Sequence, residues 1–336
     1  GTLTLGPASG AYRACYLEVE SGSLTIGNAV SISEAPGAFG FYIGNQGAGD
    51  VRFSGSWSVN RAAFDLFNRG GGTLTLSGAM NLNNGARNLV ITGNEEVVIS
   101  GAISNGSLEK TGSGTLTLNG ANTFSGATTV TGGTLSYNGT NANSTVTVKA
   151  GATLKGTGTL GPLVVEGTVQ PGQTIGTLGV SSLTLAGGGT NVIQYGAAAG
   201  VPGTAWDRIL VGAGSGSISV TATPGSPHAI LLDASSLTLF TNTMSYAWKI
   251  IDGGSVTDFA ENRFVLVETG WPDLGTGALT LRQADGDLYV DFTPAGGATF
   301  VWDAGGGSDR DWSQATNWQA RRPSISSICR SGARHS

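Results

Sequence analysis

The chain is poor in the residue types that most often build metal sites and covalent cross-links. It has 336 residues, of which two are cysteines, Cys15 and Cys329, and two are histidines, His228 and His335. Cys329 and His335 both lie in a terminal segment of unusual composition, so the body of the chain keeps one residue of each type. One cysteine and one histidine are too few for a disulfide framework or a zinc site. We therefore expect no metal and no other cofactor.

Charge is also scarce, and it is unevenly distributed. Asp, Glu, Lys and Arg make up 12% of the residues, about half the usual share. Residues 321–336 contain four arginines and no acidic residue, which leaves 13 basic and 22 acidic residues and a net charge of −9 in the rest. Because phosphate binding needs clustered lysine and arginine, this acidic body argues against nucleic acid as a partner.

Long hydrophobic runs are missing as well. No stretch of about 18 apolar residues occurs, so we expect no transmembrane helix and no insertion of this segment into a membrane. The chain opens on "GTLTLGPASG", without an initiating methionine or a signal peptide. We therefore expect a mature or excised part of a longer protein, with the signal peptide and the translocator outside this chain.

Glycine, by contrast, is abundant and alternates with short aliphatic segments. There are 56 glycines, and 39% of the residues are hydrophobic. The phrase Gly/Ala-Thr-Leu, or a close relative, recurs about every 20 residues. Its leucines are Leu3, Leu24, Leu74, Leu116, Leu135, Leu154, Leu160 and Leu178. This period predicts a solenoid of about 13 coils that share one narrow core.

The residues within each unit alternate as expected for strands. In "TLTL" (115–118), Leu116 and Leu118 lie on one face of the strand, and the two threonines lie on the other. Thr and Asn side chains are expected to stack from coil to coil in hydrogen-bonded ladders. Only "NRAAFDLFNRG" (60–70) leaves room for a few helical residues. The segment "ALTLRQADGDLYVDF" (278–292) predicts a hairpin with its turn near Ala284, Asp285 and Gly286.

The pattern divides the chain into four parts. Residues 1–195 are expected to form β-helix coils, and residues 196–299 a continuing or capping β region with longer strands. Residues 300–320 are expected to begin a truncated further unit, and residues 321–336 to be a non-native or disordered tail. The fold class expected is all-β, with a parallel β-solenoid followed by a more irregular, hairpin-containing C-terminal part.

One stretch of the first part carries a denser pattern, "LEKTGSGTLTLNGANTFSGATTVTGGTL" (108–135). It resembles the autotransporter-associated β-strand repeat. The matching positions are Leu108, Lys110, Gly112, Gly114, Leu116, Leu118, Gly120, Asn122, Phe124, Gly126, Thr128, Val130, Gly133 and Leu135. The resemblance implies a right-handed parallel β-helix that is exported and displayed on, or released from, a Gram-negative bacterium. It implies no chemistry, and only one clear copy of the repeat occurs.

Candidates for catalysis are few. His228, in "TPGSPHAIL", reads as a loop histidine without a role, because no Gly-x-Ser-x-Gly elbow accompanies it. A carbohydrate-cleaving β-helix needs paired carboxylates on one face, and the sequence does not show that any converge. The acids that coil stacking could gather are Asp207, Asp233, Asp252 and Asp258.

Two other acidic positions have simple interpretations. Asp207 and Arg208 are expected to form an exposed pair. Glu95 and Glu96 are expected to point to opposite faces of a strand, so they cannot act together from it.

Aromatic residues are the better candidates for binding. Trp302, Trp312 and Trp318 lie in a short stretch rich in Gly, Asp and Asn, and their rings can stack on sugars or anchor a protein partner. The alternative is that they cover the end of the solenoid or begin the next unit. The function expected is non-enzymatic: an exported structural or adhesive passenger at the cell surface, in biofilm or in glycan contact. Partners would be surface glycans, protein surfaces or further copies of the chain. The alternative function is a carbohydrate-binding or carbohydrate-cleaving β-helix.

Overall fold

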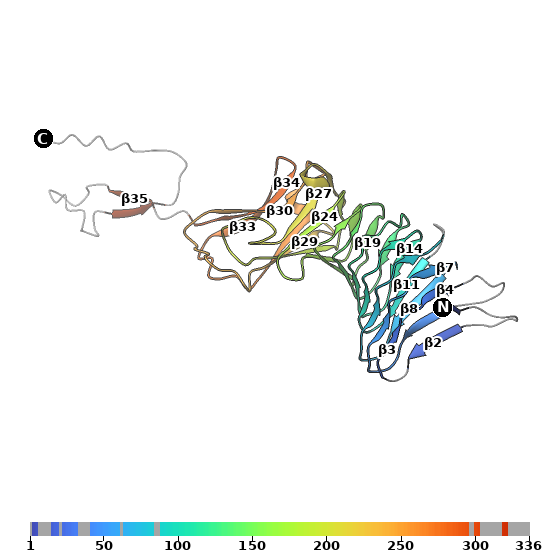
Figure 1. Ribbon diagram of the computed structural model, residues 1–336. Helices are drawn as coiled ribbons and strands as arrows, with labels where there is room; N and C mark the ends of the chain where they lie inside the picture. Colours follow the sequence, from blue (N-terminus) through green and yellow to red (C-terminus); the bar gives the residue numbers. More distant parts are fainter. Residues whose placement is uncertain are drawn as a thin grey trace, which may run out of the picture.

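The protein is a stack of short strands wound into a solenoid (Figure 1). The computed structural model describes residues 2–5, 15–19, 22–32, 41–60, 63–83, 88–295, 299–302 and 318–321. Two short 3-10 helices, η1 (Gly212–Gly214) and η2 (Glu261–Arg263), are the only helical segments in these ranges. None of the helices in the described part of the chain has the length and hydropathy needed to span a bilayer.

Two sheets of eleven parallel strands run along the solenoid. Sheet B contains β2 (Cys15–Val19), β5 (Phe41–Asn45), β8 (Ala63–Asn68), β11 (Asn88–Gly93), β14 (Ser107–Lys110), β16 (Thr128–Val130), β19 (Val146–Val148), β22 (Leu163–Val165), β25 (Leu183–Leu185), β28 (Ser217–Val220) and β31 (Ser255–Thr257). Sheet C contains β3 (Leu24–Ile26), β6 (Val51–Phe53), β9 (Leu74–Leu76), β12 (Val97–Ile99), β15 (Thr115–Leu118), β17 (Thr134–Tyr137), β20 (Thr153–Gly156), β23 (Thr168–Pro171), β26 (Thr190–Gln194), β29 (His228–Asp233) and β32 (Phe264–Thr269).

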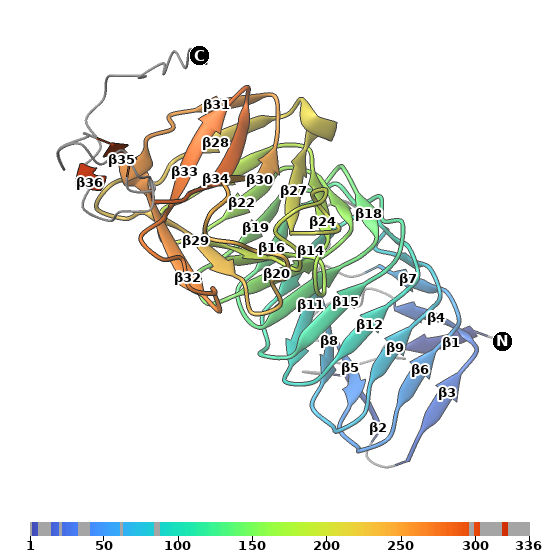
Figure 2. The same cartoon turned by 90° about the vertical axis from the view of Figure 1, so that its left-hand side faces the viewer.

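The third side of the coils is divided between two shorter sheets (Figure 2). Sheet A contains β1 (Thr2–Leu5), β4 (Ala29–Ile32), β7 (Trp57–Val59), β10 (Met80–Asn81) and β13 (Ile103–Ser104). Sheet D contains β18 (Thr140–Asn141), β21 (Thr159–Leu160), β24 (Thr177–Val180), β27 (Arg208–Val211), β30 (Tyr246–Asp252), β34 (Asp287–Thr293) and β33 (Ala278–Ala284). A separate antiparallel pair is formed by β35 (Thr299–Trp302) and β36 (Trp318–Arg321). The all-β solenoid predicted from the sequence is therefore confirmed.

Coil length changes along the chain, and this explains an error in the predicted coil count. Leu116 of β15 pairs with Leu135 of β17, 19 residues later, which fits the predicted period. Thr190 of β26, however, pairs with Ala229 of β29, 39 residues later. Because the late coils carry long corners, the described residues supply eleven strands per long sheet rather than about 13 coils. At the usual strand spacing, eleven strands span about 48 Å.

The core is a single column of mostly aliphatic side chains, with some aromatic rings, inside the coils. Leu116 and Leu118 are fully buried and their flanking threonines are not, so the predicted alternation is confirmed. The helical alternative for residues 60–70 is wrong, since Ala63–Asn68 forms β8. Strand β8 pairs with both β5 and β11, and its Phe64 and Leu66 are buried in the core. Packing inside the stack decides the structure there, not helix propensity.

The C-terminal end of the solenoid is covered by aromatic residues and a hairpin. Tyr195 packs against Trp248 and Trp271, with ring centroids 5.2 and 5.3 Å apart. The hairpin of β33 and β34 is antiparallel, as predicted. Its turn residues Asp285 and Gly286 have φ angles of 52° and 86°, the left-handed conformation that a two-residue hairpin turn requires.

Candidate functional site: a polar groove on sheet C

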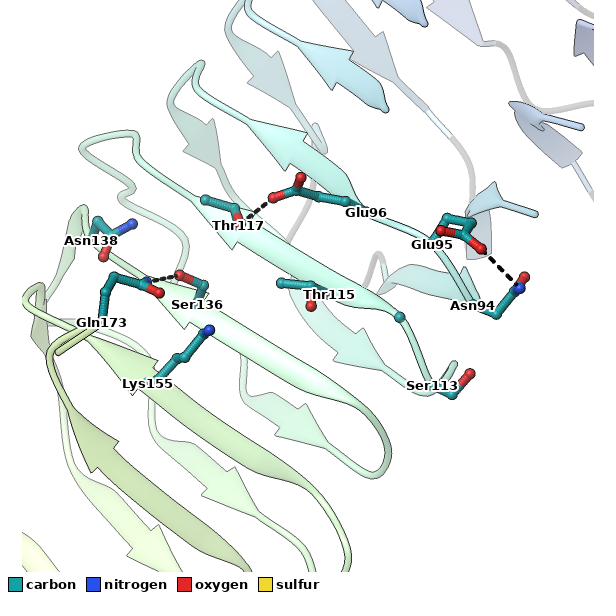
Figure 3. Close-up of a pocket in the computed structure, with 11 residues that line it drawn as sticks. Asn94, Glu95, Glu96, Ser113, Thr115, Thr117, Ser136, Asn138, Lys155 and Gln173 are labelled. Atoms are coloured by element: carbon teal, nitrogen blue, oxygen red, sulfur yellow. Dashed lines mark hydrogen bonds between the residues drawn. The ribbon is translucent and has the colours of Figure 1, made fainter. Parts of the chain in front are cut away.

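A polar groove of about 610 Å³ lies on the outer face of sheet C (Figure 3). It crosses five coils, because its residues come from the segments at β12, β15, β17, β20 and β23. The lining residues are Asn94, Glu95, Glu96, Ser113, Gly114, Thr115, Thr117, Ser136, Asn138, Lys155 and Gln173. None of them is aromatic or aliphatic, so the groove suits a ligand with many hydrogen-bonding groups.

The strand register places the groove residues in columns along the solenoid. Thr117 lies beside Ser136, and Ser136 lies beside Lys155, since these positions pair in β15, β17 and β20. The three are spaced by 19 residues, so the coil period applied to outward positions predicts this column. The sequence analysis followed only the inward leucines and missed the groove.

Hydrogen bonds fix the side chains at both ends of the groove. Thr117 donates its hydroxyl to Oε1 of Glu96 over 3.1 Å, and Asn94 donates Nδ2 to Oε1 of Glu95 over 3.2 Å. At the other end, Nε2 of Gln173 donates to the hydroxyl of Ser136 over 2.6 Å (Figure 3). The prediction for Glu95 and Glu96 was wrong: they lie in the bend before β12, not in the strand, and both line the groove.

A ladder of five threonines adjoins the groove. They occupy successive paired positions of β15, β17, β20, β23 and β26 and are all half-buried. The ladder is Thr115, Thr134, Thr153, Thr168 and Thr190. The predicted stacking is therefore present, and Nδ2 of Asn138 also donates to Oδ1 of Asn119 over 3.1 Å. The structure shows no hydroxyl-to-hydroxyl bond between these five threonines.

Two buried polar residues, Lys110 and Asn122, hold the coils at 108–135 together. The side chain of Lys110 is 1% exposed, and its ammonium donates to the carbonyl oxygens of Gly112 and Gly132, in adjacent coils. Burial lowers the pKa of Lys110 to about 8. Among the residues that the structure describes, Lys110 forms no ion pair with a carboxylate. Its ammonium instead links the glycine-rich corners of two adjacent coils through their backbone carbonyls.

Asn122 replaces a strand where sheet A ends and sheet D begins. Its Oδ1 accepts the backbone N–H of Ile103 over 2.8 Å, and its own N–H donates to Thr140 of the next coil over 2.7 Å. Nδ2 donates to the phenol oxygen of Tyr137 over 3.1 Å and to the carbonyl of Gly120 over 3.0 Å. The polar positions of the motif thus satisfy backbone groups that a missing strand leaves open.

Comparison with protein families matches residues 108–136 to the passenger-associated-transport-repeat. This segment is an autotransporter passenger-type repeat. Proteins with the repeat are passengers that are exported to the cell surface, and the repeat family is generally structural. No curated protein matches the chain. The motif positions inferred from the sequence thus lie in the matched passenger repeat, where its leucines, Phe124 and Val130 form the core.

Outside the passenger repeat, the four candidate carboxylates do not form one site. Asp207 is fully buried, and its two oxygens accept the backbone N–H groups of Gly176 and Gln194 over 2.8 and 2.9 Å. Burial raises the pKa of Asp207 to about 7, although these two amide donors oppose the shift. The predicted exposed pair with Arg208 is wrong, because Arg208 binds Asp252 instead.

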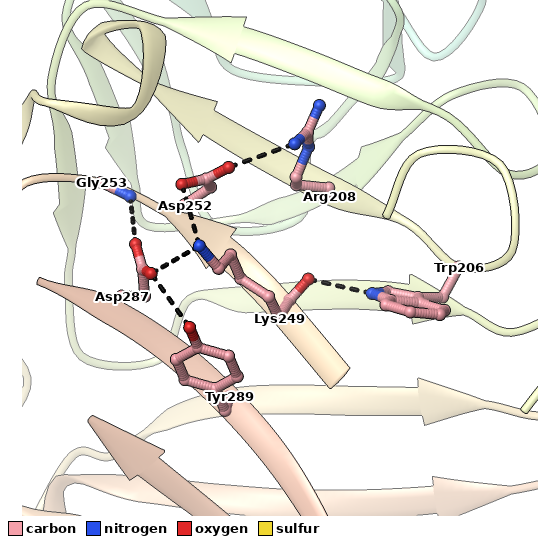
Figure 4. A network of polar contacts seen from close by, with 7 residues as sticks. All are labelled: Trp206, Arg208, Lys249, Asp252, Gly253, Asp287 and Tyr289. Carbon is pink, nitrogen blue, oxygen red and sulfur yellow. Dashed lines mark hydrogen bonds and ion pairs between the residues drawn. The ribbon is translucent and has the colours of Figure 1, made fainter. Parts of the chain in front are cut away.

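The remaining acids have other surroundings. Asp233 accepts the backbone N–H of Ser235, and Asp258 is exposed at a turn with φ 58°. Asp252 belongs to an ion-pair network on the outside of sheet D, with Lys249 and Asp287 (Figure 4). Within the described ranges, no three His, Cys, Asp or Glu side chains gather closely enough to hold a metal ion.

His228 is not a loop residue, which corrects the prediction. It begins β29 and is fully buried, with Nδ1 donating to the carbonyl of Ala186 over 2.8 Å. Its Nε2 is buried without a partner, and burial lowers its pKa to about 4. The imidazole is therefore neutral and structural, and it has no access to solvent.

The three tryptophans proposed for binding are only partly placed. Trp302 of β35 and Trp318 of β36 occupy opposite positions in the antiparallel pair. Trp312 lies outside the described residues, as do residues 322–336 of the tail. Their role in binding stays a prediction.

Proposed function

We propose that the chain is a non-enzymatic part of an autotransporter passenger, a stiff rod that holds a lateral polar surface away from the cell. The observation that carries this proposal is the uninterrupted stack of eleven strands in sheet C, of which five supply the groove. Each coil buries its core against its neighbours, so the described part of the rod has no hinge that a lid or closing cleft would need.

The groove supports a contact role better than a cutting role. Glycoside cleavage needs two carboxyl groups on either side of the scissile bond. Asp207 cannot reach a substrate because it is fully buried, and its oxygens are occupied by backbone N–H groups. Glu95 and Glu96 lie together at one end of the groove and are held by neutral donors, without an acid across from them in its lining.

Display of the chain on cells tests the passenger role. The chain would be fused between a signal peptide and an autotransporter translocator in a Gram-negative host, and surface exposure would be measured with an antibody on intact cells. We expect surface display of a fragment that resists added protease. Retention of the fusion inside the cell, with rapid digestion after lysis, would contradict the proposal.

A polysaccharide assay tests the absence of cleavage. The purified chain would be incubated with a panel of polysaccharides while reducing ends are counted. We expect no release. Release that disappears in Asp233→Asn would show that the chain is a hydrolase, because Asp233 is the accessible member of the Asp207 and Asp233 neighbours.

A further inference from the structure

The groove on sheet C contains one cation and no acidic partner for it. Lys155 projects outward from β20, is half-buried, and has Ser136 of β17 and Gln170 of β23 as its lateral neighbours. In the described part of the chain, no carboxylate forms an ion pair with Lys155. The other lysines are occupied: Lys149 binds Glu166 over 2.8 Å and Lys249 binds Asp287 over 2.7 Å. Lys110 is buried, and its ammonium donates to backbone carbonyls. Lys155 is therefore available to an anionic group of a ligand.

The rest of the groove offers acceptors and donors at regular steps from Lys155. Glu96 lies three coils away, at about 14 Å along the solenoid axis. Between them the floor carries the hydroxyl of Thr117 and the amide of Asn138, whereas Ser136 is 2% exposed and its hydroxyl accepts from Gln173. A ligand that lies along this floor meets hydrogen-bonding groups at every coil and one positive charge.

Several ligand classes fit this arrangement poorly. A peptide would need pockets for apolar side chains, and the lining has no apolar side chain. A nucleic acid would place phosphates next to two glutamates, with a single lysine to neutralise them. Sugar hydroxyls, in contrast, both donate to carboxylates such as Glu96 and accept from hydroxyls and amides.

We infer that the groove binds an extended polysaccharide in which uronic acids are separated by neutral sugars, with one uronic-acid carboxylate on the Lys155 ammonium and the hydroxyl groups of the neutral sugars along Thr117 and Asn138 toward Glu96. The inference rests on the proposed contact role of the rod and names its partner class. Without an aromatic platform for stacking, a single groove should bind weakly, with a Kd of about 1 mM. Binding is expected to weaken as salt is added, because Lys155 is only half-buried.

A pair of matched sugars and a pair of matched variants test the inference. The probes are a tetrasaccharide with one terminal glucuronate and three neutral galactose units, and its methyl ester, which has the same backbone without charge. The variants are Lys155→Met and Lys149→Met, which remove the same charge inside and outside the groove. Binding would be followed by NMR titration, and thermal unfolding would confirm that both variants fold.

We expect the acidic sugar to bind the wild type and Lys149→Met equally, and Lys155→Met about tenfold more weakly. The methyl ester should bind all three proteins as weakly as Lys155→Met binds the acid. Equal binding of both sugars, or an unchanged affinity in folded Lys155→Met, would overturn the acidic class. Absence of binding by either sugar would overturn the inference altogether. The display and reducing-end assays do not depend on either sugar, so these failures are separable from failure of the proposed passenger role.

Discussion

The ammonium of Lys249 lies 2.7 Å from Oδ2 of Asp287. This ion pair joins β30 to β34 of the terminal hairpin. Strand β30 is the last strand of sheet D that pairs in parallel with its predecessor. Asp287 is 5% exposed and also accepts the N–H of Gly253 over 2.9 Å and the phenol of Tyr289 over 3.1 Å (Figure 4). These contacts raise the pKa of Lys249 above its usual value, with the bond to Asp287 the largest cause. One nearly buried carboxylate thus reinforces the backbone pairing of β30 and β34 that joins the hairpin to the rod.

Replacement of that carboxylate should loosen the end of the rod. Asp287→Ala leaves the Gly253 N–H without its acceptor and removes the nearer of the two carboxylates that bind the Lys249 ammonium, which should lower the free energy of unfolding by about 2–3 kcal/mol. Denaturant unfolding measures the change. Asp291→Ala on the same strand is the control: it breaks an exposed pair with Arg282, and a loss below about 1 kcal/mol is expected. Equal losses in the two variants would contradict the assignment.

The amide of Asn122 should be required for the junction between sheets A and D. Asn122→Ala leaves the N–H of Ile103 buried and unpaired, so the free energy of unfolding should fall by about 1–3 kcal/mol. Asn119→Ala is the matched control, since Asn119 is exposed, and its effect should stay within about 0.5 kcal/mol. Hydrogen exchange of the Ile103 amide reports the local effect. An Ile103 amide that stays protected in Asn122→Ala would show that another group caps it.

Alanine substitutions at two glycines with positive φ should distinguish the cost of backbone strain from the cost of a steric clash. Gly133 has φ 61°, and a Cβ there would lie 2.4 Å from the carbonyl oxygens of both Gly112 and Gly114. Gly151 has φ 82° and no atom within 4 Å of such a Cβ. Gly151→Ala should therefore cost about 1–2 kcal/mol from the backbone alone, and Gly133→Ala at least about 3 kcal/mol. Thermal unfolding checks both, and a smaller loss for Gly133→Ala than for Gly151→Ala would refute the close coil approach.

Burial of His228 predicts a loss of stability in acid. Its folded pKa of about 4 lies below the unfolded value of 6.5, so the unfolded chain binds the proton first. Stability should fall as pH drops from 6.5 toward 4, by up to about 3 kcal/mol. His228→Asn places an amide donor near the Nδ1 position that bonds Ala186, and it cannot titrate.

The comparison of wild type with His228→Asn isolates this effect from that of Asp207. The raised pKa of Asp207, about 7 against 3.8, acts with the opposite sign, because the folded state binds that proton first. Urea unfolding at pH 7 and pH 4 should show a larger loss for the wild type than for His228→Asn. Parallel pH dependence of the two proteins would mean that His228 stays accessible to protons.

The sequence predicted the parts of the fold that local pattern determines. Leu116 and Leu118 alternate with threonine, and Leu135 follows Leu116 at one coil period, so strand, core face and stacking direction are all visible in the chain. The hairpin turn at Asp285 and Gly286 was visible for the same reason, because its signal lies in adjacent residues.

Features that depend on distant contacts were not visible. Asp207 looked like a surface residue beside Arg208, yet its partners Gly176 and Gln194 lie 31 and 13 residues earlier. His228 follows a proline, which suggested a loop, but the stack places it opposite Phe264 in sheet C. The predicted number of coils was too high because the corners after Thr190 vary in length, so the sequence there has no regular period.

The coil from Thr190 to Ala229 is about twice as long as those of the passenger repeat, and its strands still keep register with both neighbours. The additional residues leave at the corners, as in the turn at Thr223–Ser226, where nothing lies within 4 Å of a Cβ at Gly225. Residues can therefore be inserted at a corner and change the outer surface while the strand register and the core stay the same. An engineer could graft a foreign peptide at such a corner without rebuilding the core.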